Sequence, residues 1–239
     1  MFTTFPQGSL ISIIGRPMMG KTTLALNIYK EFMQDGTKKT AFLTSHQTPE
    51  KIKQRLNKMM GDEQIKSSYN IIDVASCDSA DALCAIIQEA NADVVFLDSM
   101  HFMRFFYSVD VSNYNEYLAG ISLRLKQLAK KLGITLIITC RTNYQVNERE
   151  GVNGIMPILS DGDMMGDWGY FSDEVLGVYR PEADCVMVDA KGYDMRGVLY
   201  VLHLKTTNSE LINQYDKYRI TPKTGTLTQM ETGERSKLF

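Results

Sequence analysis

The chain has 239 residues, of which 44% are hydrophobic and 23% charged, a composition typical of a globular protein and unlike that of disordered chains. Its net charge of −2 excludes a basic coat for duplex DNA, so any nucleic-acid contact must be local. No run of 18 apolar residues is present, and the first residues do not resemble a secretory signal. We therefore expect a cytoplasmic protein that does not contact membranes.

Short β-rich runs alternate with longer amphipathic stretches along most of the chain, which indicates a parallel sheet covered by helices on both faces. Strands are predicted at Leu10–Ile14, Thr40–Thr44, Asn70–Val74, Val94–Leu97, Thr135–Thr139 and Val175–Tyr179. Helices are predicted near residues 21–34, 49–60, 79–90 and 113–132. Three later runs alternate as antiparallel strands do, at Val198–Leu204, Tyr215–Thr221 and Thr226–Gln229. We expect one α/β domain over residues 1–239, with a mainly parallel central sheet and an antiparallel C-terminal extension.

The segment after the first predicted strand fits the phosphate-binding pattern G-x-x-x-x-G-K-[ST], with a strand before it and an amphipathic helix after it. Its residues are Gly15, Arg16, Pro17, Met18, Met19, Gly20, Lys21, Thr22 and Thr23. Glycines let backbone amides surround phosphate oxygens, and the helix N-terminus adds partial positive charge. Lys21 is expected to reach the β- and γ-phosphates, and Thr22 to bind Mg²⁺.

An aspartate at the end of another predicted strand supports the prediction of a nucleotide site. The apolar run Val94–Leu97 ends at Asp98, which would hold Mg²⁺ because this hard cation prefers oxygen ligands. An aspartate at the end of a strand is common by itself, but with Lys21 and Thr22 it predicts a site for ATP or GTP with Mg²⁺.

Two long irregular segments, 101–112 and 143–173, interrupt the pattern, and loops of this length in a compact domain are usually functional or mobile. Trp168 lies in the second segment. It either stacks on a nucleic-acid base or packs in the interior.

Several ordered blocks resemble the RecA-like ATPase domain of DnaB-type replicative helicases, over about residues 7–229. The blocks are the Gly-Arg-Pro opening and Met-Gly-Lys-Thr close of the phosphate loop, Leu125–Ile134, Leu159–Asp161, Phe171–Arg180 and Lys205–Asn208. The phosphate loop alone does not discriminate among nucleotidases, whereas the ordered set does. The block over 159–180 disfavours a recombinase or a circadian-type ATPase.

The resemblance implies ATP-driven translocation on single-stranded DNA in replication. It also implies a homo-oligomer, usually a hexameric ring, with ATP between neighbouring subunits and replication proteins as further partners. Two inner loops would hold the DNA, at about 101–113 and 143–157. The second loop offers Asn143, Gln145, Asn147 and Arg149 as phosphate ligands, or is a solvated polar loop. Arg180 is a further candidate for a nucleotide contact.

The chain departs from the family's catalytic pattern at three positions. The usual glutamate after the second strand falls on His46, the glutamine ending the fourth strand falls on Arg141, and the arginine finger falls on Thr207. Lys205 is retained. Only seven residues precede Gly8, so we expect neither the family's N-terminal domain nor its linker helix.

These departures leave two interpretations open. In the first, Arg141 acts in cis as the missing finger and His46 orients the attacking water, so that the chain still hydrolyses ATP. In the second, Arg141 is a salt-bridged surface residue and His46 an ordinary loop residue. The chain would then be a catalytically impaired, nucleotide-binding regulatory or scaffold protein that acts with another helicase or ATPase.

Overall fold

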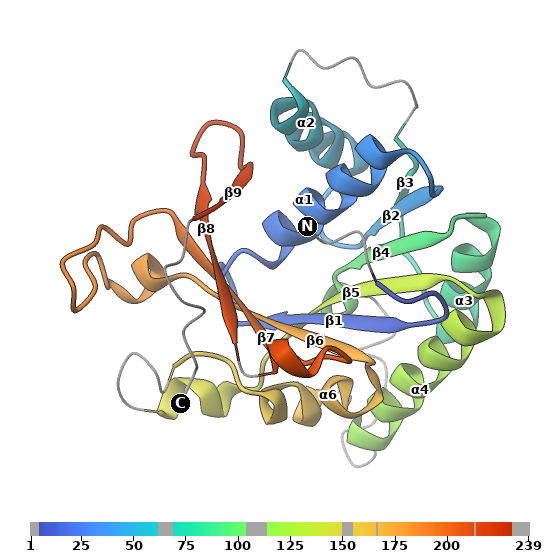
Figure 1. Ribbon diagram of the computed structural model, residues 1–239. Coiled ribbons are helices and arrows are strands. Elements are labelled where there is room, and N and C mark those ends of the chain that lie inside the picture. The colour runs from blue at the N-terminus through green and yellow to red at the C-terminus, as the bar shows by residue number, and fades with distance from the viewer. Residues whose placement is uncertain are drawn as a thin grey trace.

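The computed structural model describes residues 5–61, 69–103, 114–149, 155–165, 167–212 and 214–230. These residues build one sheet with the strand order β3-β2-β4-β5-β1-β6-β7-β8-β9 (Figure 1). In chain order the strands are β1 (Leu10–Gly15), β2 (Thr40–Thr44), β3 (Ile71–Asp73), β4 (Val94–Asp98), β5 (Thr135–Arg141), β6 (Glu174–Tyr179), β7 (Val198–Lys205), β8 (Tyr215–Ile220) and β9 (Leu227–Gln229).

The first six strands pair in parallel, and β7, β8 and β9 extend the same sheet with antiparallel pairing. The central strands β1 and β4 are buried along their whole length, as their continuous apolar sequences require. The predicted fold class, a mainly parallel α/β sheet with an antiparallel C-terminal extension, is therefore confirmed.

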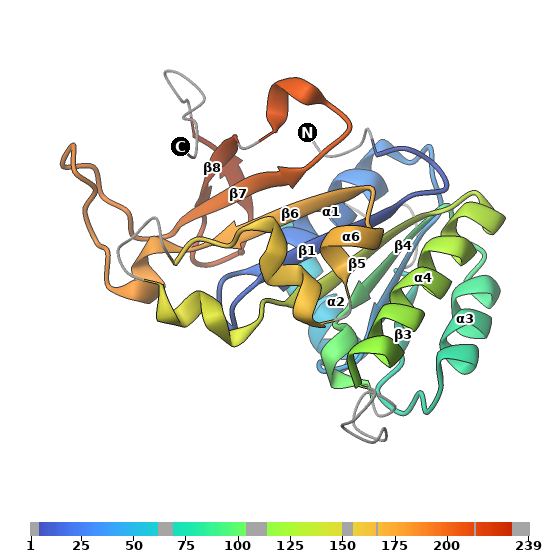
Figure 2. The ribbon, with the colours of Figure 1, turned by 90° about the horizontal axis from the view of Figure 1, so that it is seen from below.

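Helices cover both faces of the sheet (Figures 1 and 2). They are α1 (Lys21–Asp35), α2 (Pro49–Met60), α3 (Ala80–Glu89), α4 (Tyr114–Leu132) and the short α6 (Trp168–Phe171). Helices α1 and α2 pack on one face around Tyr29, Phe32 and Leu56. Helices α3, α4 and α6 pack on the other face, with the fully buried Trp168 among them. Of the two possibilities for Trp168, the structure shows packing in the interior.

Short 3₁₀ segments complete the described chain. They are η1 (Met100–Phe102), η4 (Tyr144–Glu148), η5 (Leu159–Met165), η6 (Pro181–Asp184) and η7 (Ser209–Leu211). No described helix has both the length and the apolar character needed to cross a membrane.

The predicted elements all occur, with differences at their ends. Strand β5 continues two residues beyond its predicted end at Thr139, because Cys140 and Arg141 pair with Ile14 and Gly15 of β1. The turns η1, η4, η5, η6 and η7 and helix α6 were not predicted, because segments this short show no hydrophobic period. Of the first predicted DNA loop, positions 104–113 lie outside the described residues, as do 150–154 of the second.

Candidate functional site

The loop between β1 and α1 has the geometry that its glycines predict. Gly20 adopts φ +99°, which side chains disfavour, and α1 begins immediately afterwards at Lys21. A Cβ on Gly15 would lie 2.9 Å from the carbonyl oxygen of Val178 in β6, so only glycine fits there. The loop is therefore held against the sheet, with the N-terminus of α1 facing the cavity above it.

Lys21 extends back over this loop. Its Nζ donates hydrogen bonds to the carbonyl oxygens of Gly15 at 2.7 Å and Arg16 at 2.8 Å. Burial lowers the pKa of Lys21 from 10.5 to about 8, while the nearby Asp98 acts in the opposite direction. Lys21 is therefore a cation held at an energetic cost beside a site suited to anions.

Asp98 ends β4 and is almost fully buried. Its Oδ1 accepts hydrogen bonds from Thr139 at 2.5 Å and Thr22 at 3.2 Å. Its buried Oδ2 has no hydrogen-bond partner among the described residues, and His46 Nδ1 lies 4.0 Å from it. A buried carboxylate oxygen without a donor, next to a threonine hydroxyl, is a donor set that fits Mg²⁺ directly or through water.

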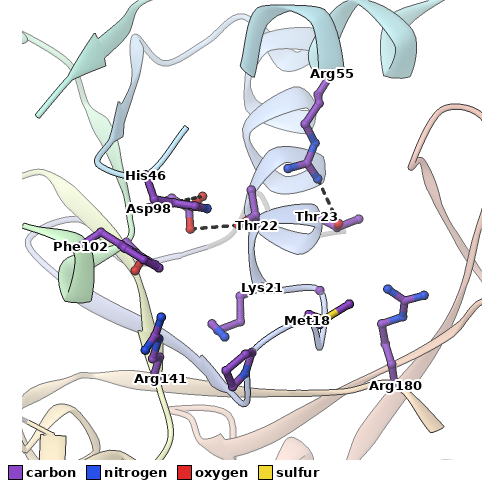
Figure 3. A pocket seen from close by; sticks show the side chains of 13 residues that line it. Met18, Lys21, Thr22, Thr23, His46, Arg55, Asp98, Phe102, Arg141 and Arg180 are labelled. Atoms are coloured by element: carbon purple, nitrogen blue, oxygen red, sulfur yellow. Dashed lines mark hydrogen bonds and ion pairs between the residues drawn. The ribbon is translucent and has the colours of Figure 1, made fainter. Parts of the chain in front are cut away.

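A cavity of about 310 Å³ opens above these groups. Figure 3 shows Lys21, Asp98 and the other labelled side chains arranged around it. The lining consists of Pro17, Met18, Gly20, Lys21, Thr22, Thr23, His46, Arg55, Asp98, Ser99, Phe102, Arg141 and Arg180. Predicted residues at or just after the ends of five strands, β1, β2, β4, β5 and β6, therefore meet in one place, as parallel strands that end at the same edge of a sheet require.

Two of the three departures from the family pattern, His46 and Arg141, reach this cavity, and both contact Phe102. The His46 ring stacks on the Phe102 ring with centroids 5.0 Å apart, and the Arg141 guanidinium carbon lies 4.9 Å from the same centroid. No ion pair to a carboxylate is recorded for Arg141 within the described residues. Both interpretations of Arg141 therefore remain predictions.

Three lining residues were missed from the sequence, namely Arg55, Ser99 and Phe102. Arg55 of α2 donates to Thr23 Oγ1 at 3.2 Å and brings another cation to the cavity, and burial lowers its pKa. The buried residues Ile52 and Leu56 flank Arg55 on the inner side of α2, a signal that it lies near the sheet.

The other side chains that were predicted to contact the nucleotide either do not line the cavity, or line it while being exposed or ion-paired. Arg16 is ion-paired with Asp184, and Met19 is buried, so neither side chain lines the cavity. Met18 lines it but is 88% exposed. Arg180 lines it and is ion-paired with Glu182.

Lys205 ends β7 and does not line the cavity of its own chain. Its Nζ donates to the carbonyl oxygens of Gly169 at 3.1 Å and Tyr170 at 2.9 Å. Thr207, in the position of the finger, donates to Glu174 at 3.5 Å. The predicted catalytic role of Lys205 therefore remains a prediction.

The predicted DNA ligands occupy a folded turn, not an open loop. Asn143 is only 7% exposed, and Arg149 is ion-paired with the buried Asp161 at 2.5 Å. Asn147 accepts a long hydrogen bond from Arg16 at 3.4 Å. Gln145 and Arg149 line a second cavity at this turn. Of the four, Gln145 and Asn147 keep the most freedom to contact phosphate, and DNA binding itself remains a prediction.

With this geometry in place, the chain can be compared with known proteins. Its fold is that of the RecA-like ATPase domains found in DnaB-like helicases, which confirms the predicted resemblance at the level of fold. A solved DnaB-like replicative helicase, described with its interactions with primase, superposes with a TM-score of 0.78 at 18% identity, covering 95% of this chain and 58% of that one. A solved ATPase domain gives the same score and identity, with 95% and 86% coverage.

Two further known proteins are similar to this chain. A KaiC-like protein of Pyrococcus horikoshii superposes with a TM-score of 0.63 at 15% identity, covering 95% of this chain and 91% of that chain. A probable plasmid replicative DNA helicase of Chlamydia psittaci is 24% identical over 203 residues. That match covers 74% of this chain and 43% of the relative, so this chain spans less than half of the relative's length. No family model matches the chain.

Proposed function

We propose that this protein binds ATP in the cavity above the phosphate loop and hydrolyses it in DNA replication, coupled to single-stranded DNA. The observation that carries the proposal is the convergence of Lys21, Thr22 and Asp98 on one cavity at the N-terminus of α1. Lys21 would contact the β- and γ-phosphates, whose charge offsets the cost of holding this buried cation.

Thr22 and Asp98 would hold Mg²⁺, in keeping with the unpartnered Oδ2 of Asp98. When bound, the ion neutralises charge on the β- and γ-phosphate oxygens. The chain's own contribution is to hold the Asp98 side chain in a fixed orientation, through the hydroxyls of Thr22 and Thr139.

Arg141 would act in cis on the γ-phosphate, because it lines the same cavity as Lys21 and no carboxylate among the described residues neutralises it. His46 would orient the attacking water, in the position where the family has glutamate. Lys205 would serve a neighbour's nucleotide in a homo-oligomer, for which a hexameric ring is the expected form. Gln145 and Asn147 would contact the DNA backbone, with smaller roles for Asn143 and Arg149.

The test is steady-state ATP hydrolysis with and without single-stranded DNA, for the wild type and Lys21→Ala. Lys53→Ala, which removes an exposed lysine of α2, is the matched control. We expect turnover that DNA stimulates, that Lys21→Ala abolishes and that Lys53→Ala preserves.

A second outcome would favour the regulatory or scaffold interpretation. If the wild type binds ATP without turning it over, the replacements at His46, Arg141 and Thr207 have removed catalysis. Turnover that falls on dilution would separately contradict a cis role for Arg141, since a trans contribution depends on assembly.

A further inference from the structure

An exposed aromatic side chain at the edge of a phosphate-binding cavity requires an explanation. Phe102 is 42% exposed, although the residues on either side of its turn, Met100 and Met103, are fully buried. These two methionines anchor η1 in the core, and hydrogen bonds from the Phe102 and Met103 amides close the turn. The turn therefore presents the Phe102 ring outward in a fixed orientation.

The backbone around Phe102 is tied to both neighbouring strand ends. Ser45, adjacent to His46, donates from Oγ to the Ser99 carbonyl at 2.5 Å and accepts from the Ser99 amide at 3.0 Å. These bonds connect the segment after β2 to the start of η1. The positions of the His46 and Phe102 backbones are thus set together.

The same turn is connected to the end of β5. The Arg141 amide donates to His101 Nδ1 at 3.3 Å. Burial, Arg141 and Lys21 lower the pKa of His101 to about 3, so this ring stays neutral and can accept that bond at ordinary pH. The backbones of His46, Phe102 and Arg141 therefore form one hydrogen-bonded frame, with their side chains meeting at the cavity (Figure 3).

We propose that Phe102 is a positioning residue, whose ring orients His46 by stacking and the Arg141 guanidinium by a cation–π contact. A guanidinium over an aromatic face keeps its in-plane N–H donors available, unlike one paired with a carboxylate. This proposal rests on the proposed ATPase function, and assigns to Phe102 the task of restricting the side chains of His46 and Arg141 at the cavity. A leucine would fill similar space without an aromatic face.

The experiment compares Phe102→Leu, Phe102→Tyr and the matched surface control Tyr193→Leu. Phe102→Leu should lower kcat about tenfold, equal to ~1.4 kcal/mol at 25 °C, and leave the nucleotide Kd near the wild-type value. Phe102→Tyr retains the aromatic face and should restore kcat. Tyr193→Leu, at an exposed position distant in sequence, should turn over as the wild type does.

A double variant separates positioning from general damage. If Phe102 acts through Arg141 and His46, Phe102→Leu should lower kcat by a smaller factor in the Arg141→Ala background than in the wild type, because only the orientation of His46 is then left to lose. The proposal would be overturned if the kcat losses of the two single variants multiplied in full in the double variant. It would also be overturned if Phe102→Leu had the kcat of the wild type.

A second readout does not need turnover. In NMR spectra, the Arg141 side-chain and His46 ring resonances should shift in Phe102→Leu as the ring current of Phe102 disappears, and should stay in place in Tyr193→Leu. If the wild type fails to hydrolyse ATP, the proposed function fails, while these shifts still decide the role of Phe102. Unmoved resonances would refute the inference by themselves.

Discussion

Replacing Lys21 by methionine should alter how the stability of the protein depends on pH. Burial lowers the pKa of Lys21 from 10.5 to about 8 in the folded chain. Between these two pKa values, the Lys21 side chain is therefore protonated in the unfolded chain and largely deprotonated in the folded chain. Stability must rise with pH between these two values, because the unfolded state binds more protons there.

The size of the effect follows from the two pKa values. Linkage between about 8 in the folded state and 10.5 in the unfolded state gives the wild type a gain of ~2 kcal/mol between about pH 7 and about pH 9.5. Lys21→Met has no proton to release at this position and lacks this gain. Taking the difference between the two proteins removes the contributions of other titrating groups.

Urea unfolding at both pH values measures this difference. The single tryptophan, Trp168, is fully buried and reports the transition by fluorescence. Lys53→Met, at an exposed lysine, should show the same pH dependence as the wild type. If the wild type and Lys21→Met give parallel free energies of unfolding at the two pH values, Lys21 is not a buried cation held at a cost.

Three further predictions concern the same site. Gly15→Ala should destabilise the fold by roughly 1–3 kcal/mol in thermal or urea unfolding, because its Cβ would lie 2.9 Å from the Val178 carbonyl oxygen; unchanged stability would mean that the loop is not held against β6. Thr139→Val removes the hydroxyl that donates to Asp98 at 2.5 Å, and should lower the free energy of unfolding in urea by about 1–3 kcal/mol. A free energy of unfolding equal to that of the wild type would contradict this prediction. Asp98→Asn should remove the Mg²⁺ dependence of ATP binding, so that titrations with and without a chelator agree; a persistent difference would place the ion elsewhere.

Much of the site could be predicted because its chemistry is encoded locally. The run from Gly15 to Thr23 carries the turn, the cation and the hydroxyl in one segment, and the apolar strand before Asp98 fixes the edge at which that aspartate lies. Parallel strand order then brings both to one cavity. The fold class followed from the same alternation of strands and helices.

What the sequence did not predict depends on side-chain contacts between distant segments. Phe102 looked like one more apolar residue in an irregular stretch, and its contacts come from His46 and Arg141, far from it in sequence. Arg149 looked like a free phosphate ligand, and only the folded turn brings it against Asp161. Charge and residue type indicate what a side chain can bind, but not which group of the same chain it already contacts in the fold.

The position of β1 has a consequence for how the chain is made. This strand is made before the other strands of the sheet, yet both of its neighbours come late: β5 pairs it through Leu10 and Leu136, and β6 through Ile11 and Glu174. Until β5 has been made, an apolar strand and the phosphate loop that follows it have no neighbouring strand, and one edge of β1 stays unpaired until β6 follows. Such non-local pairing slows folding and exposes unpaired strand edges. Nascent chains that stop before β6 should therefore neither fold nor bind nucleotide, although they contain every residue of the phosphate loop.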